Sequence, residues 1–267
     1  MEEKVFLFIT DIHQQIDNVK ALDFSIYDGV ICAGDIIDPA NQSVETGKKI
    51  LSLLPEDTFI IPGNCDTDRE IYSLLCGMKN CIERTTKQIF NIPIAGIGRS
   101  RSLEDDINVY RDYFLDDKTR VDEFINSGGS HFILKYAGIN SNKTVIDNKT
   151  IIRQNTVFFE KFISYTESEL YDIFNGNELT NGILVTHSPP YGVLDKLPGL
   201  PHIGSNGVLH CIQIANPTLI LSGHFHELAG IVHENGKVYF NPGSLKDGYY
   251  GVIHVKDDTF DCLIKKL

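Results

Sequence analysis

Side chains that can bind a metal ion follow five short apolar runs of this sequence. The runs cover residues 5–9, 30–33, 59–61, 183–185 and 219–221. Nearly continuous apolar runs of this length are typical of strands buried on both faces of a sheet. Because α/β sheets bind their ligands at the carboxyl ends of the strands, the polar side chains are predicted to converge. These side chains are Asp11, His13, Asp35, Asn64, His187, His224 and His226.

The donor atoms of this set are imidazole nitrogens, carboxylate oxygens and one amide oxygen. Such a mixture suits transition metals better than Ca²⁺ or Mg²⁺ alone. We therefore expect two divalent ions as cofactors, with manganese as the first expectation and Fe, Zn, Ni or Co as alternatives. Two ions about 3.5–4 Å apart, joined by a shared carboxylate, can lower the pKa of a bridging water and clamp a phosphate for in-line attack.

The first hundred residues alternate strand and helix patterns. Apolar residues at helical spacing occupy 13–24 and 44–54, and Thr67-x-x-Glu70 has capping-box spacing ahead of a third helix. Residues 89–97 then form one or two strands, interrupted by Pro93. Strand-helix alternation implies a parallel sheet with right-handed crossovers.

The last third of the chain changes to antiparallel patterns. Asn235-Gly236 separates two strand-like runs and suits a type I′ hairpin turn. Two more strands are expected at 250–255 and 259–264. Parallel strands early and antiparallel strands late predict an α/β fold in which two packed mixed β-sheets are flanked by helices.

The segment 103–180 differs from its surroundings, because it is rich in charge and has no metal-binding residue at a strand end. We expect a β-hairpin over 131–152 and a helix over 158–174. The chain is therefore predicted to be a single domain, 1–267, with an insertion or flap at about 103–180. This insertion would serve as a lid over the site or as the contact of a homodimer.

Composition restricts the partners of the protein. The 267-residue chain has a formal net charge of −12, which disfavours broad binding to nucleic acid. No apolar run approaches the ~18 residues needed to span a bilayer, so no membrane association is expected. Six cysteines without a CxxC pair and an N-terminus unlike a signal peptide predict a cytoplasmic protein.

The motifs around the seven residues are weak singly and specific together. In chain order they resemble those of the calcineurin-like metallophosphoesterases, and Asn241-Pro242-Gly243-Ser244 resembles the compact archaeal and bacterial members. The segment 103–180 shows no such resemblance. The motifs are Asp11-Ile12-His13, Gly34-Asp35-Ile36-Ile37-Asp38, Gly63-Asn64-Cys65-Asp66, His187 and Gly223-His224-Phe225-His226.

The resemblance implies a four-layer αββα sandwich and a dinuclear site. Asp11, His13 and His226 would hold the first metal. Asn64, His187 and His224 would hold the second, and Asp35 would bridge both. A metal-bridged hydroxide would attack phosphorus, while Asp35, Asn64 and His187 take part in catalysis. Asp38 and Asp66 would orient ligands, although Asp38 reads equally well as a helix-start residue before Pro39.

Cys65 departs from the pattern of many family members, which carry a histidine after the metal-binding asparagine. That histidine can protonate the leaving oxygen, a contribution of ~10²–10⁴ in rate. A thiol beside two cations would tend toward thiolate and is a poor replacement. The resemblance to the Gly-Asn-Cys-Asp branch therefore favours phosphodiesterase activity, with weak action on alkyl monoesters.

Three further residues are candidates near a bound phosphate ester. His202, in a loop rich in glycine and proline, is a candidate substitute acid and substrate contact, or simply an exposed loop histidine. Arg99 follows Gly98 and suits phosphate oxygens, or is an ordinary surface arginine. Ser205 could contact substrate, but its spacing favours the N-cap of a helix at 207–214.

Two other functions fit the same sequence. The first is a catalytically weak metal-binding scaffold for protein interaction, which would explain why position 65 carries a cysteine and no acid. The presence of all seven metal ligands argues against it, because a scaffold does not need them. An Mn²⁺-dependent nuclease fits the metal site, but the acidic balance and the lack of basic stripes argue against it. We therefore expect a metal-dependent phosphoric ester hydrolase that acts on a small phosphate ester.

Overall fold

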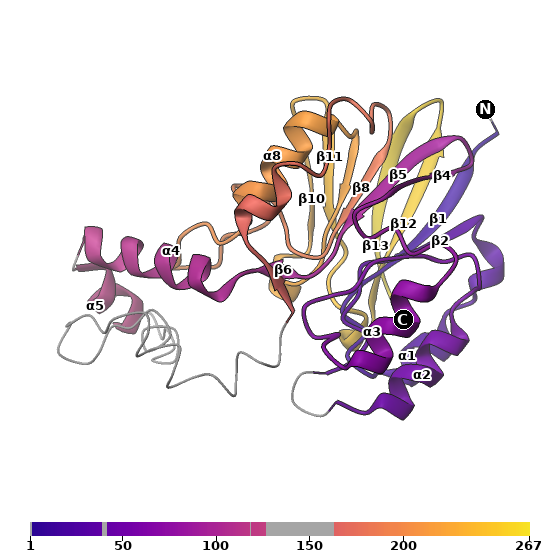
Figure 1. Ribbon diagram of the computed structural model, residues 1–267, viewed down its shortest axis with the longest axis horizontal. Coiled ribbons are helices and arrows are strands. Elements are labelled where there is room, and N and C mark those ends of the chain that lie inside the picture. The colour runs from indigo at the N-terminus through magenta and orange to yellow at the C-terminus, as the bar shows by residue number, and fades with distance from the viewer. Residues whose placement is uncertain (1, 39–41, 118, 127–162) are drawn as a thin grey trace.

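Two large mixed β-sheets pack face to face in the computed structural model, which describes residues 2–38, 42–117, 119–126 and 163–267 (Figure 1). The first sheet has the strand order β13-β12-β1-β2-β3, and the second β10-β11-β9-β8-β5-β4. The first contains β1 (Lys4–Ile9), β2 (Gly29–Cys32), β3 (Phe59–Ile60), β12 (Tyr249–Lys256) and β13 (Thr259–Lys266). The second contains β4 (Thr86–Ile89), β5 (Ile92–Ile97), β8 (Ile183–Thr186), β9 (Leu219–Leu221), β10 (Gly230–Glu234) and β11 (Lys237–Asn241).

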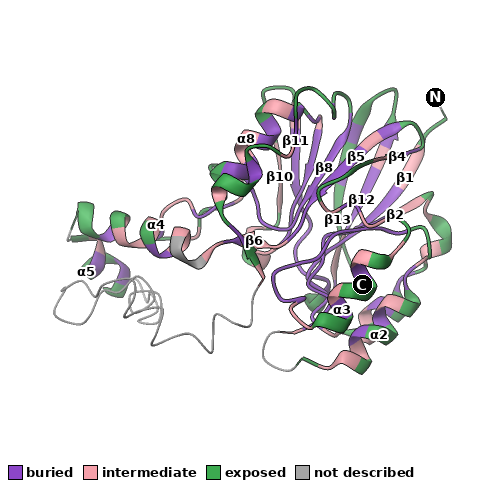
Figure 2. Cartoon of the chain, in the orientation of Figure 1, coloured by how far each residue is buried: buried purple, intermediate pink, exposed green. Residues whose placement is uncertain are grey.

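The five apolar runs of the sequence all form parallel strands, four of them central and one, β3, at the edge of the first sheet. β1, β2 and β3 run parallel in the first sheet, and β5, β8, β9 and β11 run parallel in the second. Between the sheets lies a core of buried apolar side chains that includes Phe8, Ile31, Val185 and Phe240. Figure 2 shows that buried residues run along the strands of both sheets. The near-continuous apolar runs follow from burial on both faces.

Helices cover the outer face of each sheet. α1 (Ile16–Ala21), α2 (Val44–Leu53) and α3 (Arg69–Gly77) pack on the first sheet through a second apolar cluster. α8 (Asn206–Ala215) and the 3₁₀ turn η2 (Glu167–Leu170) pack on the second sheet through a third cluster. The four-layer αββα arrangement is therefore confirmed (Figure 1).

Two predicted helices differ from the structure in detail. The first is short, because His13 and Gln14 have φ of 44° and 64°, which no α-helix accommodates. The helix ends at Ala21, and the 3₁₀ turn η1 (Phe24–Ile26) begins only at the end of the predicted range. The third is capped by Asp68, whose carboxylate accepts the N–H groups of Glu70 and Ile71, so a capping box at Thr67 was wrong.

Two tight turns close the hairpins of the last third. Asn235 and Gly236 have φ of 51° and 76°, which confirms the type I′ turn between β10 and β11. Asp257 and Asp258, with φ of 47° and 61°, make an equivalent turn between β12 and β13. The remaining short elements are β6 (Ser100–Arg101), which pairs with β7 (Ser164–Tyr165), and the 3₁₀ turns η3 (His226–Leu228) and η4 (Leu245–Asp247).

The expected insertion begins with two helices, α4 (Leu103–Asp116) and α5 (Thr119–Asn126), which extend to one side of the sandwich (Figure 1). The hairpin expected at 131–152 lies outside the described residues. The helix expected over 158–174 is wrong from residue 163 onward, where β7 and η2 stand instead. Tyr165 and Leu170 already belong to the apolar cluster of the second sheet, so packing on the sandwich overrides helical spacing there. No helix within the described ranges is long and apolar enough to cross a membrane.

Candidate metal centre

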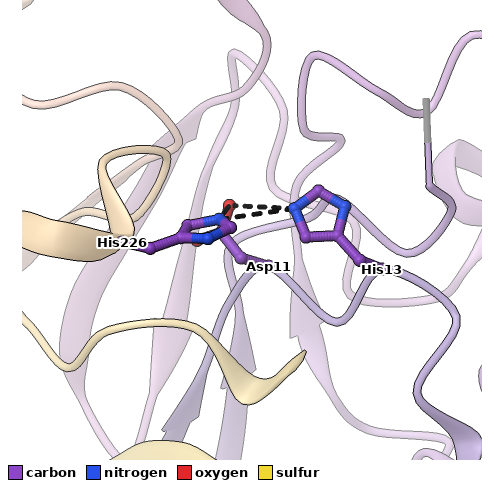
Figure 3. A group of neighbouring side chains, drawn as sticks. All are labelled: Asp11, His13 and His226. Atoms are coloured by element: carbon purple, nitrogen blue, oxygen red, sulfur yellow. Dashed lines mark hydrogen bonds and ion pairs between the residues drawn. The ribbon is translucent and has the colours of Figure 1, made fainter. Parts of the chain in front are cut away.

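Three of the predicted ligands meet where β1 ends and β9 leads into the next loop (Figure 3). His226 Nε2 lies 3.2 Å from Asp11 Oδ1, and His13 Nε2 lies 3.3 Å from His226 Nε2. Asp11 Oδ1 is buried, and among the described residues it receives no hydrogen bond of good geometry. A buried carboxylate oxygen facing two imidazole nitrogens fits a divalent cation.

Three more ligands converge on a second point. The Oδ1 of Asn64 lies 2.8 Å from His187 Nε2 and 2.9 Å from His224 Nδ1. Burial, followed by the charge of His187, lowers the pKa of His224 to about 4, so its imidazole is neutral at pH 7. A neutral imidazole has the free lone pair that metal ligation needs.

Asp35 lies between the two groups. Its Oδ2 is 3.7 Å from His13 Nε2 and 3.5 Å from His187 Nε2. Its Oδ1 is engaged by the N–H of Cys65 at 2.8 Å. One carboxylate oxygen therefore faces both groups, which is the arrangement that a bridging ligand requires.

The ligands are held on strained backbone. Asp11, His13, Asp35 and His224 all have φ between 44° and 67°, a left-handed conformation that costs about 1–3 kcal/mol per non-glycine residue. Backbone hydrogen bonds offset this cost, since Asp11 N–H donates to Gly34 and His13 N–H donates to Asp35. The strain turns each side chain from its strand end into the site.

Glycines precede three of the ligands because the chains approach closely there. A Cβ at Gly63 would lie 2.0 Å from Asp35 Oδ1, and one at Gly223 would lie 2.1 Å from Thr10 Oγ1. Both distances are far inside van der Waals contact. Glycine at these positions therefore lets the loops of neighbouring strands pack around the carboxylates.

Backbone carbonyls orient two of the imidazole rings. The Nδ1–H of His187 donates to the Ala33 carbonyl at 2.8 Å, and that of His13 donates to the Ile37 carbonyl at 3.2 Å. Each bond fixes the tautomer and leaves the Nε2 lone pair facing the site.

Asp66 stabilises the loop that carries Asp35. Its carboxylate accepts four backbone N–H groups, those of Asp35, Ile36, Ile37 and Gly63, at 2.8–3.2 Å. Burial and the nearby Asp35 charge raise the pKa of Asp66, while the N–H groups oppose this shift. These bonds to the loop of Asp35 are compatible with the predicted role of Asp66, which is to orient a metal ligand. Asp38 forms an ion pair with Lys246 at 3.3 Å, and the Ile37 carbonyl accepts the Nδ1–H of His13. An orienting role of Asp38 stays a prediction.

Cys65 lies against the Asp35 carboxylate, to which its N–H donates, and is 3% exposed. Burial, followed by the Asp35 charge, raises the pKa of its thiol. In the metal-free site the group therefore holds its proton tightly. The tendency toward thiolate expected beside two bound cations stays a prediction. In neither state is it an effective proton donor near neutral pH.

Several residues of the site were missed by sequence reasoning. Thr10 Oγ and the N–H of His224 donate to Asp11 Oδ2 at 2.8 and 3.0 Å, and Ser244 Oγ donates to the Asp11 carbonyl at 2.8 Å. Asn241 Nδ2 donates to the Phe225 carbonyl at 3.0 Å. The signal was present in the Asn-Pro-Gly-Ser motif, whose polar ends hold the loops of Asp11 and His226.

The three candidate substrate contacts are engaged within the protein. Arg99 Nη2 donates to the Tyr72 hydroxyl at 2.7 Å, and its Nε lies 3.7 Å from Glu83. Ser205 is buried, accepts the Val208 N–H at 3.0 Å and donates to Glu167, which matches the N-cap alternative. His202 is 36% exposed and lies 2.6 Å from Asp195.

Two groups of donors around the Asp35 carboxylate are suited to holding divalent metal ions. The chain belongs to the calcineurin-like phosphoesterases, because the model of that family matches residues 4–228. It is therefore a metal-dependent hydrolase of phosphate esters. A search of curated proteins gives no match.

Solved structures show the same fold. The protein TT1561 of Thermus thermophilus is 16% identical, with 97% of each chain covered and a TM-score of 0.54. A second solved structure is 14% identical, with 99% of each chain covered and a TM-score of 0.63. At these identities the likeness establishes the architecture, while the site rests on the residues of this chain.

Replacing Asp35 by asparagine should disrupt metal binding. An amide is a weaker and uncharged bridge, so bound metal is expected to fall from about two ions per chain to one or fewer. Metal content after incubation with Mn²⁺ and desalting measures this, and circular dichroism reports on folding. Asp17→Asn, on the exposed face of α1, is the matched control. A full metal complement in Asp35→Asn would contradict the bridging assignment.

Proposed function

We propose that this protein is a dinuclear phosphodiesterase that hydrolyses small phosphate diesters, and phosphomonoesters with good leaving groups. The observation that carries the proposal is Cys65, which stands beside Asn64 where a proton donor would serve alkyl monoesters. A site without an acid at that position favours esters whose leaving oxygen needs little protonation.

The seven ligands would divide as the contacts of the site suggest. Asp11, His13 and His226 would hold one ion, Asn64, His187 and His224 the other, and Asp35 both. When bound, the two ions would activate a water for in-line attack and offset charge on the phosphoryl oxygens. The imidazoles of His187 and His224 would offset charge on the phosphoryl oxygens, and Asp66 would hold the Asp35 loop through its four N–H bonds.

Manganese remains the first expectation for the metals, with Fe, Zn, Ni and Co as alternatives, because this donor set accepts several ions and availability decides. The net charge of −12 supports a small substrate over a polynucleotide. All six cysteines are free thiols, in keeping with the expected cytoplasmic setting. A homodimer through the insertion at 103–180 remains a prediction.

A panel of phosphate esters tests the function. Bis(4-nitrophenyl) phosphate is expected to turn over faster than 4-nitrophenyl phosphate, and alkyl monoesters slowest, with Mn²⁺, Ni²⁺, Zn²⁺ and Mg²⁺ assayed separately. Chelation should abolish activity, and added Mn²⁺ should restore it. Two tightly bound ions with no activity on any ester would support the scaffold instead, and cleavage of DNA with Mn²⁺ would support the nuclease.

Cys65→His should raise turnover of alkyl monoesters, because imidazole supplies a proton donor at position 65. We expect a gain of about 10-fold or more in kcat for an alkyl monoester, and little change for a 4-nitrophenyl ester. Cys65→Ser, which adds no effective acid, is the control. If Cys65→His binds metal normally and raises turnover of no ester, the role given to position 65 is wrong.

A further inference from the structure

The loop between β8 and α8, residues 188–205, leaves the metal centre at the carboxyl end of β8. It begins directly after the ligand His187 and ends at Ser205, the N-cap of α8. Its two ends are joined, since Ser205 N–H donates to the Pro189 carbonyl and Tyr191 N–H donates to the Ser205 carbonyl. Loops at the carboxyl ends of parallel strands form the rim of α/β active sites.

Within this loop, Asp195 is a buried carboxylate that the sequence did not single out. It is 1% exposed, and its Oδ2 accepts the N–H groups of Gly192 and Gly204 at 2.9 and 3.0 Å. Its Oδ1 lies 2.6 Å from His202 Nδ1. Because a carboxylate only accepts, His202 Nδ1 carries the proton of this bond, and Nε2 is left as the nitrogen available outside the loop.

The position of His202 is fixed by packing as well. The ring of Tyr191 lies 5.4 Å from its imidazole. Leu197 and Leu200 of the same loop pack against Phe114 of α4 and Phe124 of α5. The start of α4 is tied to the loop by the buried Arg101, which donates to the Gly204 carbonyl at 3.0 Å and to Asp106 at 2.7 Å.

An oriented, partly exposed histidine on the rim contrasts with the buried thiol at position 65. Exposure of 36% leaves the imidazole accessible to a substrate, whereas Cys65 is 3% exposed. Oriented His–carboxylate pairs of this kind are suited to general acid–base catalysis.

We propose that His202, positioned by Asp195, protonates the leaving oxygen in this enzyme. As hydroxide adds to phosphorus and the P–O bond to the leaving group breaks, the imidazolium form of His202 gives its Nε2 proton to the departing oxygen. The ring is left as the neutral Nδ1–H tautomer bonded to Asp195, and Nε2 later regains a proton from solvent. Asp195 is the positioning residue, and α4 and α5 support the loop that carries the pair. This inference rests on the proposed phosphoesterase function.

The positioning role of Asp195 can be tested through the tautomer of His202, which is measured without metal or substrate. In the metal-free wild type, ¹⁵N NMR should show neutral His202 as the Nδ1–H tautomer. In Asp195→Asn the side-chain amide can donate to Nδ1, so the Nε2–H tautomer is expected. An unchanged tautomer would overturn the assignment of Asp195.

The acid role is tested by the leaving group. With a series of aryl methyl phosphates, His202→Gln should lower kcat about 10²-fold or more for phenol, and less than about 3-fold for 4-nitrophenol, with KM unchanged. Asp195→Asn should also lower kcat more for phenol than for 4-nitrophenol, but by smaller factors than His202→Gln. His233→Gln, an exposed histidine on β10, is the matched control.

Different results of this assay would overturn the acid role of His202 and the proposed function. Equal losses for both leaving groups, or no loss for either, would overturn the acid role while leaving the phosphoesterase intact. A wild type that binds metal and cleaves none of these esters would defeat the proposed function, and the acid role with it.

Discussion

Two carboxylates buried side by side impose the constraint on which this structure depends. Asp11 and Asp35 are 1% and 2% exposed, and burying an uncompensated carboxylate costs several kcal/mol. Each has one oxygen committed to the protein: Asp11 Oδ2 accepts Thr10 and His224, and Asp35 Oδ1 accepts Cys65. The other oxygen of each faces imidazole nitrogens. Divalent cations are the partners that satisfy those two oxygens and the histidines together.

The site joins both sheets, so the packing between them sets its geometry. Asp11, Asp35 and Asn64 follow strands of the first sheet, while His187 and His224 follow strands of the second. The bonds from His187 to the Ala33 carbonyl and from the His224 N–H to Asp11 cross from one sheet to the other. The apolar core behind them holds the two halves at a fixed separation. A change in that core would therefore move the ligands relative to one another.

Much of the arrangement of strands and ligands could be predicted, because each ligand follows an apolar run typical of a strand buried on both faces of a sheet. The residues that tie the site together were harder to predict, since Thr10, Asn241 and Ser244 act through bonds to loops distant in sequence. Asp195 resembles any loop aspartate until the fold closes the loop around it. The helix expected at 158–174 failed because contacts with the second sheet, which spacing does not encode, decide the conformation from residue 163.

Anomalous X-ray diffraction from crystals grown with Mn²⁺ tests the central claim most directly. We predict two anomalous peaks about 3.5–4 Å apart, on either side of Asp35 Oδ2. The first should lie within bonding distance of Asp11, His13 and His226, and the second of Asn64, His187 and His224. A single peak, or two peaks that do not share Asp35, would contradict the account.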